Sequence, residues 1–155
     1  IEEVVKIFNT TNCDALYGDL VFVDSVQTNK IYRKWIAGSY SDQLFLKGWM
    51  PPHPTFFVRK EIYNQYGKFN TTLKSSADYE LMVRLLYLHK IKVGYLHGTL
   101  VHMRIGGQST KSLSNRLKAN YEDYQAWRLN SLKPKWYTLL LKPIRKIKQF
   151  YFPKF

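Results

Sequence analysis

The chain has 155 residues, the length of one domain or of part of one. Hydrophobic residues make up 45% of it and aromatic residues 16%, which excludes a disordered chain and is ample for a core. The formal net charge of +13 predicts an anionic partner such as phosphate, nucleic acid or an acidic membrane face. Because Cys13 is the only cysteine, no internal disulfide can form, which fits a reducing compartment.

The first elements expected are a short helix and a β hairpin. The helix covers 2–8, a strand rich in β-formers covers 15–24, and a returning strand at 31–36 follows a turn. The opening "IEEVVKIF" resembles the middle of a helix, and no initiator Met precedes it. We therefore expect the chain to be a piece of a longer protein.

The middle of the chain alternates helices and strands. We expect a helix over 41–48 closed by Gly48, a proline-rich loop over 49–54, a buried strand over 55–59 and a helix over 60–67 closed by Gly67. A helix from Ser75 to about His89 and short strands within 92–105 come next. This order predicts an α/β fold, with a mixed sheet flanked by helices.

The last expected elements are a long helix and a basic tail. The helix covers about 111–130, with an apolar stripe of Leu113, Leu117, Tyr121 and Tyr124. We therefore divide the chain into a main unit, 1–130, and a tail, 131–155.

The stretch "SSADYELMVRLL" places two carboxylates, Asp78 and Glu80, in the first turn of a helix. One interpretation is capping: Ser75 or Ser76 caps the helix, Ser75-x-x-Asp78 resembles a capping box, and each acid adds about 0.3–1 kcal/mol through the helix dipole. The other is catalytic. Asp78 shares a helix face with core residues Met82 and Leu85, so it lies at the edge of the core, where a carboxylate is held ionised and aimed as a general base.

Three stretches carry a resemblance to a known family: "DALYGDLVFVD", "HPTFFVRKEIYNQYGKFNTTLKSSADYELMVRLL" and "MRIGGQST". In this order and spacing they resemble the second half of a family 2 glycosyltransferase of the GT-A fold, over about 1–125. The resemblance implies a partial GT-A fold that lacks its N-terminal nucleotide-binding half. The main unit, 1–130, would then be the acceptor-binding and catalytic-base part of the domain.

The resemblance also implies an activity. Members of the family are largely inverting enzymes that displace a nucleoside diphosphate from the anomeric carbon of a nucleotide-sugar donor. The Asp of an "AD" pair at the start of such a helix is the general base, and here it is Asp78. We expect a saccharide or lipid-linked acceptor, as in bacterial-type surface polysaccharide synthesis. We expect Glu80 to be a supporting substrate-side residue or to face solvent.

The chain departs from the family pattern in its metal site. The family holds a divalent metal, Mg or Mn, through an Asp-x-Asp motif, whereas Asp14, Asp19 and Asp24 have the wrong spacing. The late His that some members offer to the metal is replaced at the nearest position by Gly106. We expect the metal in the full-length enzyme, with its ligands outside this chain.

Two loops offer further substrate-binding candidates. In "WMPPHPTFF", Trp49 could stack on a sugar and His53 could bind its hydroxyls; alternatively Trp49 is a core lid and His53 a turn residue. In "MRIGGQST", Arg104 with Gly106 and Gly107 could bind a phosphate, or the stretch is a plain turn that caps the next helix.

The tail has seven basic residues and no acidic one. It predicts a helix with an apolar stripe (Leu140, Ile144, Ile147, Tyr151) and basic residues clustered away from it (Lys142, Arg145, Lys146, Lys148). This pattern is typical of a helix lying on an anionic membrane, or else of an ordinary surface helix packed on the body. We expect a cytoplasmic protein, peripheral at the inner face of the cell membrane.

Two other functions fit the composition. One is a non-catalytic basic module that binds nucleic acid or an anionic membrane, and the other is an inactive transferase-like scaffold. No recognised nucleic-acid motif accompanies the charge, so we expect no nucleic-acid partner.

Overall fold

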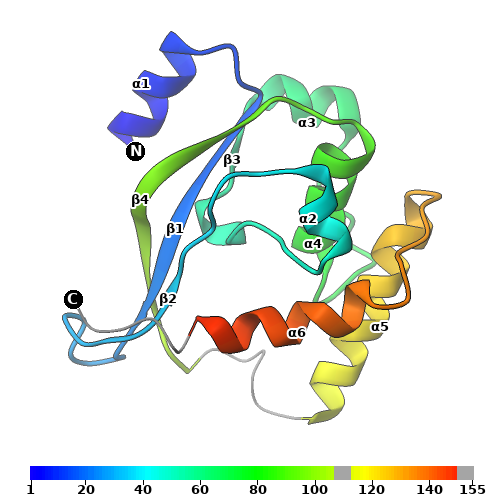
Figure 1. Ribbon diagram of the computed structural model, residues 1–155. Coiled ribbons are helices and arrows are strands. Elements are labelled where there is room, and N and C mark those ends of the chain that lie inside the picture. Colours follow the sequence, from blue (N-terminus) through cyan, green and yellow to red (C-terminus); the bar gives the residue numbers. More distant parts are fainter. Residues whose placement is uncertain (107–112, 150–155) are drawn as a thin grey trace.

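The computed structural model describes residues 1–106 and 113–149. Their fold is α/β, with a mixed four-stranded sheet and helices around it (Figure 1). The strands are β1 (Ala15–Val23), β2 (Ile31–Trp35), β3 (Phe57–Val58) and β4 (Val93–Arg104). The helices are α1 (Glu2–Thr10), α2 (Asp42–Leu46), α3 (Lys60–Tyr66), α4 (Ala77–Met82), α5 (Leu113–Leu129) and α6 (Thr138–Lys148). The predicted mixed sheet flanked by helices is confirmed.

Strand β1 is the centre of the sheet. It pairs in parallel with β4 along its whole length, and antiparallel with β3 at its beginning and β2 at its end. Its side chains are buried almost without interruption, as expected of a strand covered on both faces. Within the described residues β4 pairs with β1 alone, so the outer edge of β4 has no strand partner there.

Strand β4 corrects the expectation of several short strands. It is one strand of 12 residues, and its register against β1 shifts twice, between Gly18 and Asp19 and between Asp19 and Leu20. The first shift skips Gly98, whose φ of +137° favours glycine. The strand therefore continues through bulges where the sequence suggested breaks. The expected buried strand at 55–59 is also shorter, because β3 has only two residues, both half-buried.

The main core lies between the sheet and helices α2, α3 and α4. Figure 1 shows α2, α3 and α4 on one side of β1 and β4, and α1 on the other. Aromatic rings fill this core: the ring of Trp49 lies 5.8 Å from Tyr17 and 5.7 Å from Phe45, and Tyr87 lies 5.0 Å from Trp127. These contacts join β1, α2 and α5 around the segment that carries α4.

Helix α5 buries a different face from the one expected. Tyr121 and Tyr124 of the predicted apolar stripe are 63% and 42% exposed, so that part of the prediction is wrong. The buried residues are Asp123, Ala126, Trp127 and, just beyond the helix, Asn130. Two of these four, Asp123 and Asn130, are polar, and hydrogen bonds inside the protein satisfy them. A search for apolar residues at helical spacing therefore could not identify the buried face of α5.

The expected helix from Ser75 to His89 begins at Ala77 as α4 and continues as a π-helical turn, η2, over Val83–Leu88. Among the described residues no helix is both long enough and apolar enough to cross a membrane.

Glu80 lies at the centre of a buried polar network and is 3% exposed. Its carboxylate accepts bonds of 2.8 and 3.0 Å from the Arg84 guanidinium and one of 3.0 Å from the Asn130 amide. Arg84 also donates to the carbonyls of Gly67 and Lys68, after α3. The network joins α3, α4 and the end of α5, so the expectation that Glu80 faces solvent is wrong.

We expect Glu80→Ala to lower the free energy of unfolding by about 3–5 kcal/mol, because it leaves the largely buried Arg84 without its counter-charge. Glu61→Ala is the matched control, since Glu61 is an exposed acid in the first turn of α3. Its loss should cost under about 1 kcal/mol. Urea denaturation followed by circular dichroism measures both, and equal effects would contradict a structural role for the network.

Candidate functional site

The candidate site is a carboxylate and an imidazole from two separate segments. Asp78 is the second residue of α4, and His53 begins the 3-10 turn η1 (His53–Thr55). Nδ1 of His53 lies 2.9 Å from Oδ2 of Asp78 and donates a hydrogen bond to it. The His53 side chain is 46% exposed and that of Asp78 27%, so both are accessible to a ligand.

The surroundings of Asp78 keep it ionised. Burial raises the pKa of its carboxyl, but the His53 hydrogen bond and charge, the backbone N–H of Tyr79 and the positive charge of Lys142 together lower the pKa below its usual value. The carboxylate is therefore a hydrogen-bond acceptor at neutral pH, held in one orientation by His53.

Helix α5 holds the start of α4 in place. The Glu122 carboxylate accepts the backbone N–H groups of Ser75 at 2.6 Å and Ser76 at 3.1 Å. Ser76 is the N-cap of α4, but its hydroxyl bonds Asp123 at 2.8 Å and makes no side-chain cap bond. The interpretation of Ser75 or Ser76 as a side-chain cap, with its Ser75-x-x-Asp78 box, is therefore wrong, because the Ser76 hydroxyl is bound to α5 instead of to the first turn of α4.

Lys142 of α6 is a part of the site that the sequence did not suggest. Its Nζ lies 2.6 Å from Oδ2 of Asp123 and 3.6 Å from the centre of the Tyr79 ring, and its side chain is 13% exposed. Lys142 lies away from the apolar stripe, as expected, but it faces the protein interior, where it pairs with Asp123. The one feature of the sequence that could have indicated the inward position of Lys142 is its place on the helix opposite Leu140 and Ile144.

The loop that carries His53 is fixed to the sheet by Thr55, which is fully buried. The Thr55 hydroxyl lies 2.8 Å from the carbonyl oxygen of Gly18 and from that of Pro52, and it accepts the N–H of Gly18 at 3.3 Å. A Cβ on Gly18 would lie 2.6 Å from the Leu100 side chain, so a larger residue there would displace Leu100 of β4. Sequence reasoning did not identify Thr55.

Trp49 lies in the core, away from any ligand-accessible surface. It is 6% exposed, and its indole N–H donates to the Ala37 carbonyl at 2.9 Å. Of the two alternatives for Trp49, the core lid agrees with this burial, and stacking on a sugar does not. Glu80 likewise has its two oxygens bonded inside the protein, so neither residue faces the Asp78–His53 pair as a ligand contact.

The second candidate loop, which follows β4, is not linked to the Asp78–His53 pair by the hydrogen bonds and ion pairs of the described residues. Arg104 ends β4, opposite Val23 of β1, and its side chain is exposed. Gly106 is exposed, with φ of +102°. Gly107 lies outside the described residues. Among the described residues no hydrogen bond or ion pair joins Arg104 or Gly106 to Asp78, and their phosphate-binding role stays a prediction.

The pair does not fit a resident divalent metal. Among the described residues no three His, Cys, Asp or Glu side chains come together as a metal site. Asp78 and His53 supply two ligands, and the Nδ1 of His53 is engaged with the carboxylate itself. Mg²⁺ requires six oxygen ligands in octahedral geometry.

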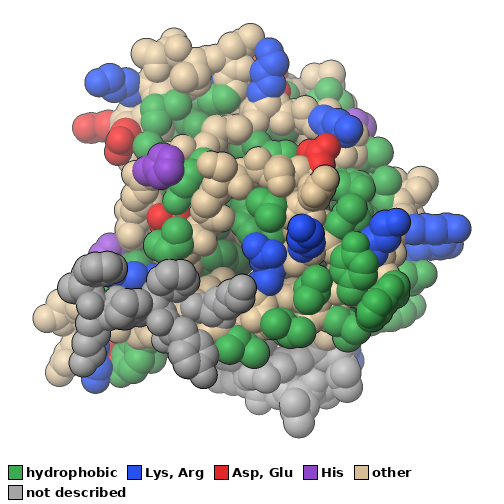
Figure 2. Space-filling view, viewed as in Figure 1, with side chains coloured by type: hydrophobic (Ala, Val, Ile, Leu, Met, Phe, Trp, Pro, Cys, Tyr) green, Lys and Arg blue, Asp and Glu red, His purple; other side chains and the backbone are tan. Residues whose placement is uncertain are grey.

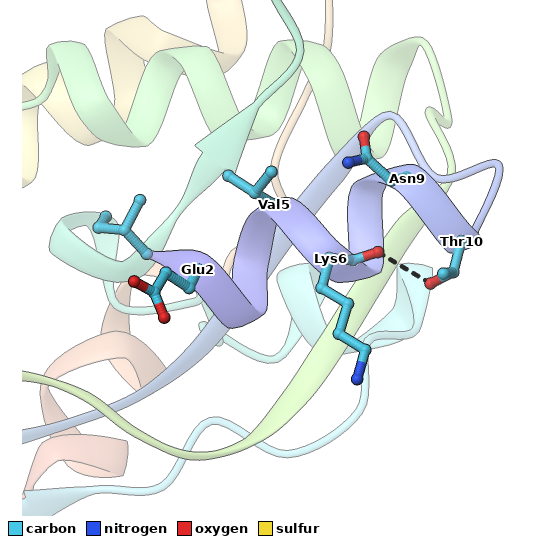
Figure 3. A pocket seen from close by; sticks show the side chains of 6 residues that line it. Glu2, Val5, Lys6, Asn9 and Thr10 are labelled. Carbon is cyan, nitrogen blue, oxygen red and sulfur yellow. Dashed lines mark hydrogen bonds between the residues drawn. The ribbon is translucent and has the colours of Figure 1, made fainter.

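A shallow hollow of the described surface lies elsewhere. It has a volume of about 460 Å³ and follows one face of α1 (Figure 3). Its lining residues are Ile1, Glu2, Val5, Lys6, Asn9 and Thr10. Thr10 bonds the Lys6 carbonyl at 2.9 Å, so its hydroxyl already has a partner within the helix.

Comparison with known proteins finds no match to a family model, to a curated protein or to a solved structure. Fold and site together define an α/β chain with a mixed sheet, which presents an ionised carboxylate beside an imidazole at the start of a helix.

We expect Asp78 to stabilise the fold in a pH-dependent way. Its pKa is lower in the folded chain than in the unfolded one, so the stabilisation is present above the unfolded pKa of about 4 and is lost as pH falls through the folded value. Asp78→Asn should therefore differ most from the unchanged chain near pH 7 and approach it as the pH falls through the folded pKa of Asp78. Urea unfolding across this range measures the difference, and a difference that stays constant with pH would contradict the prediction.

Proposed function

We propose that the chain is the acceptor-side part of an inverting family 2 glycosyltransferase, with Asp78 as its general base. The single observation that supports this function best is the Asp78–His53 pair: an ionised carboxylate, oriented by an imidazole and accessible from outside. The mixed α/β sheet is compatible with the partial GT-A fold that the sequence resemblance implies.

The reaction needs a proton acceptor at this place. As the acceptor hydroxyl attacks the anomeric carbon of the donor, a new C–O bond forms and the bond to the nucleoside diphosphate breaks. The hydroxyl proton moves to the Asp78 carboxylate, which must lie within hydrogen-bond distance of the hydroxyl. A carboxylate with a lowered pKa is a weak base, but it is ionised in every molecule at neutral pH and ready to accept the proton.

The other residues act around Asp78. His53 is a positioning residue, because its Nδ1–H fixes one carboxylate oxygen and leaves the carboxyl group accessible. Lys142 and the start of α4 hold the base from the protein side. Donor binding and the divalent metal belong to residues outside this chain. The saccharide acceptor is bound on the exposed side of the pair.

The rival function is a non-catalytic basic module, which the net charge of +13 favours. Electrostatic binding of nucleic acid weakens steeply with salt and requires only exposed basic residues. Such binding does not account for the Asp78 carboxylate held beside the His53 imidazole. Salt-dependent binding to duplex DNA that survives Asp78→Asn, in a protein without sugar transfer, would favour this rival.

Asp78→Asn in the full-length protein tests the proposal. We expect kcat for sugar transfer to fall by about 10²–10⁴, because the amide preserves the shape but cannot accept the proton. Asp42→Asn is the matched control, since Asp42 is another first-turn carboxylate with a cationic partner, Lys90 at 3.4 Å. That variant should keep its activity. Near-normal transfer by Asp78→Asn would overturn the proposal.

His53→Gln separates positioning from chemistry. Loss of the imidazole removes a hydrogen bond and a charge that lower the pKa of Asp78, so the pKa should rise. The acidic limb of the kcat/KM profile should then move to higher pH, with a smaller loss of kcat than in Asp78→Asn. An unchanged profile would show that His53 does not act on the base.

A further inference from the structure

Helix α6 is attached to the body through its polar face. The Thr138 hydroxyl donates to the Leu46 carbonyl at 2.7 Å, and Lys142 reaches Asp123 and the Tyr79 ring. The helix backbone also sits directly on Gly48, where an added Cβ would lie 2.4 Å from the backbone nitrogen of Lys142. These contacts fix which side of α6 faces the protein.

The opposite side of α6 is apolar and exposed. Positions two residues apart on an α-helix are separated by about 200°, so Leu140 projects away from both Thr138 and Lys142. Leu140 is 59% exposed, Ile144 51% and Ile147 54%, and Trp136, just before the helix, is 83% exposed. An ordinary surface helix buries its apolar stripe, whereas α6 buries its polar side and exposes the apolar one.

The charges on α6 and on the segment just before it are all positive. The sequence from residue 131 to 155 has no acidic residue, and the side chains of Lys133, Lys135 and Lys146 are exposed. Figure 2 shows hydrophobic and basic side chains together over the region where Figure 1 places α6. An exposed apolar stripe in a segment whose charges are all basic, with a Trp just before the helix, matches the layered chemistry of an anionic lipid surface.

We propose that α6 is an in-plane docking surface for an anionic lipid bilayer. Leu140, Ile144 and Ile147 enter the boundary between headgroups and acyl chains, and Lys133 and Lys135 bind the lipid phosphates. A second copy of the chain is a poorer occupant. A two-fold symmetric contact places the same patch on both partners, and here it would bring two basic surfaces face to face.

The docking surface on α6 also indicates which kind of acceptor the protein uses, an inference that rests on the proposed function. Lys142 lies on the inner side of α6 and its charge acts on Asp78, so docking of the outer side brings the base near the bilayer. A saccharide acceptor carried on a lipid would be presented there.

Vesicle co-sedimentation of the full chain tests the surface. We expect binding to vesicles of phosphatidylcholine mixed equally with phosphatidylglycerol, and little binding to phosphatidylcholine alone. Leu140→Ser with Ile144→Ser should weaken binding by about tenfold or more. Val26→Ser is the matched control, because Val26 is 86% exposed in the turn between β1 and β2.

A second pair of variants tests the charge. Lys133→Gln with Lys135→Gln, just before α6, should weaken binding to the anionic vesicles by about tenfold or more, whereas Lys68→Gln with Lys74→Gln, at exposed lysines between α3 and α4, should not. Equal binding by the α6 variants and their controls would overturn the proposal. So would a dimer, seen by sedimentation without lipid, that Leu140→Ser dissociates. Transfer to a soluble acceptor should survive these variants, which separates this test from that of Asp78.

Discussion

The buried carboxylate of Asp123 is the interaction on which the arrangement of the last three helices depends. It is 4% exposed and binds the hydroxyl of Ser76, at the start of α4, and the ammonium of Lys142, in α6. One side chain of α5 thus fixes both its neighbours. Removing it would leave a largely buried lysine without its counter-charge, which costs about 3–5 kcal/mol in comparable sites. The position of Asp78, two residues after Ser76, follows from this link.

Local signals in the sequence were sufficient for much of the fold. The hairpin of β1 and β2, the short helix α2 and the helix α3 before Gly67 could be predicted, because alternation, β-branched residues and a glycine with positive φ act within a few neighbours. The buried face of α5 could not. Asp123 and Asn130 are polar residues whose burial depends on partners in other helices, and no periodicity of apolar residues encodes such pairing.

In the candidate site, too, the features set by local sequence could be predicted and those set by distant contacts could not. Asp78 could be selected from its place on a helix face shared with Met82, since that argument concerns one helix. Its contact with His53 could not be predicted from spacing, because the buried Thr55 attaches the loop to Gly18 of the sheet and so brings His53 to it. The sequence offered Trp49 and His53 as a common substrate surface, but the indole bonds a backbone carbonyl in the core while the imidazole remains exposed.

The amphipathic pattern of α6 could be predicted from the sequence, but which side of the helix packs against the body could not. A surface helix with one apolar and one basic side ordinarily packs its apolar side against the body, so the sequence alone favours the opposite orientation. Here an acid buried on α5 selects the basic side at Lys142, which turns Leu140, Ile144 and Ile147 outward. The contact that orients the stripe is also the contact that places a positive charge near Asp78. Surface and site are therefore coupled through Lys142, so a change at Asp123 would disturb both.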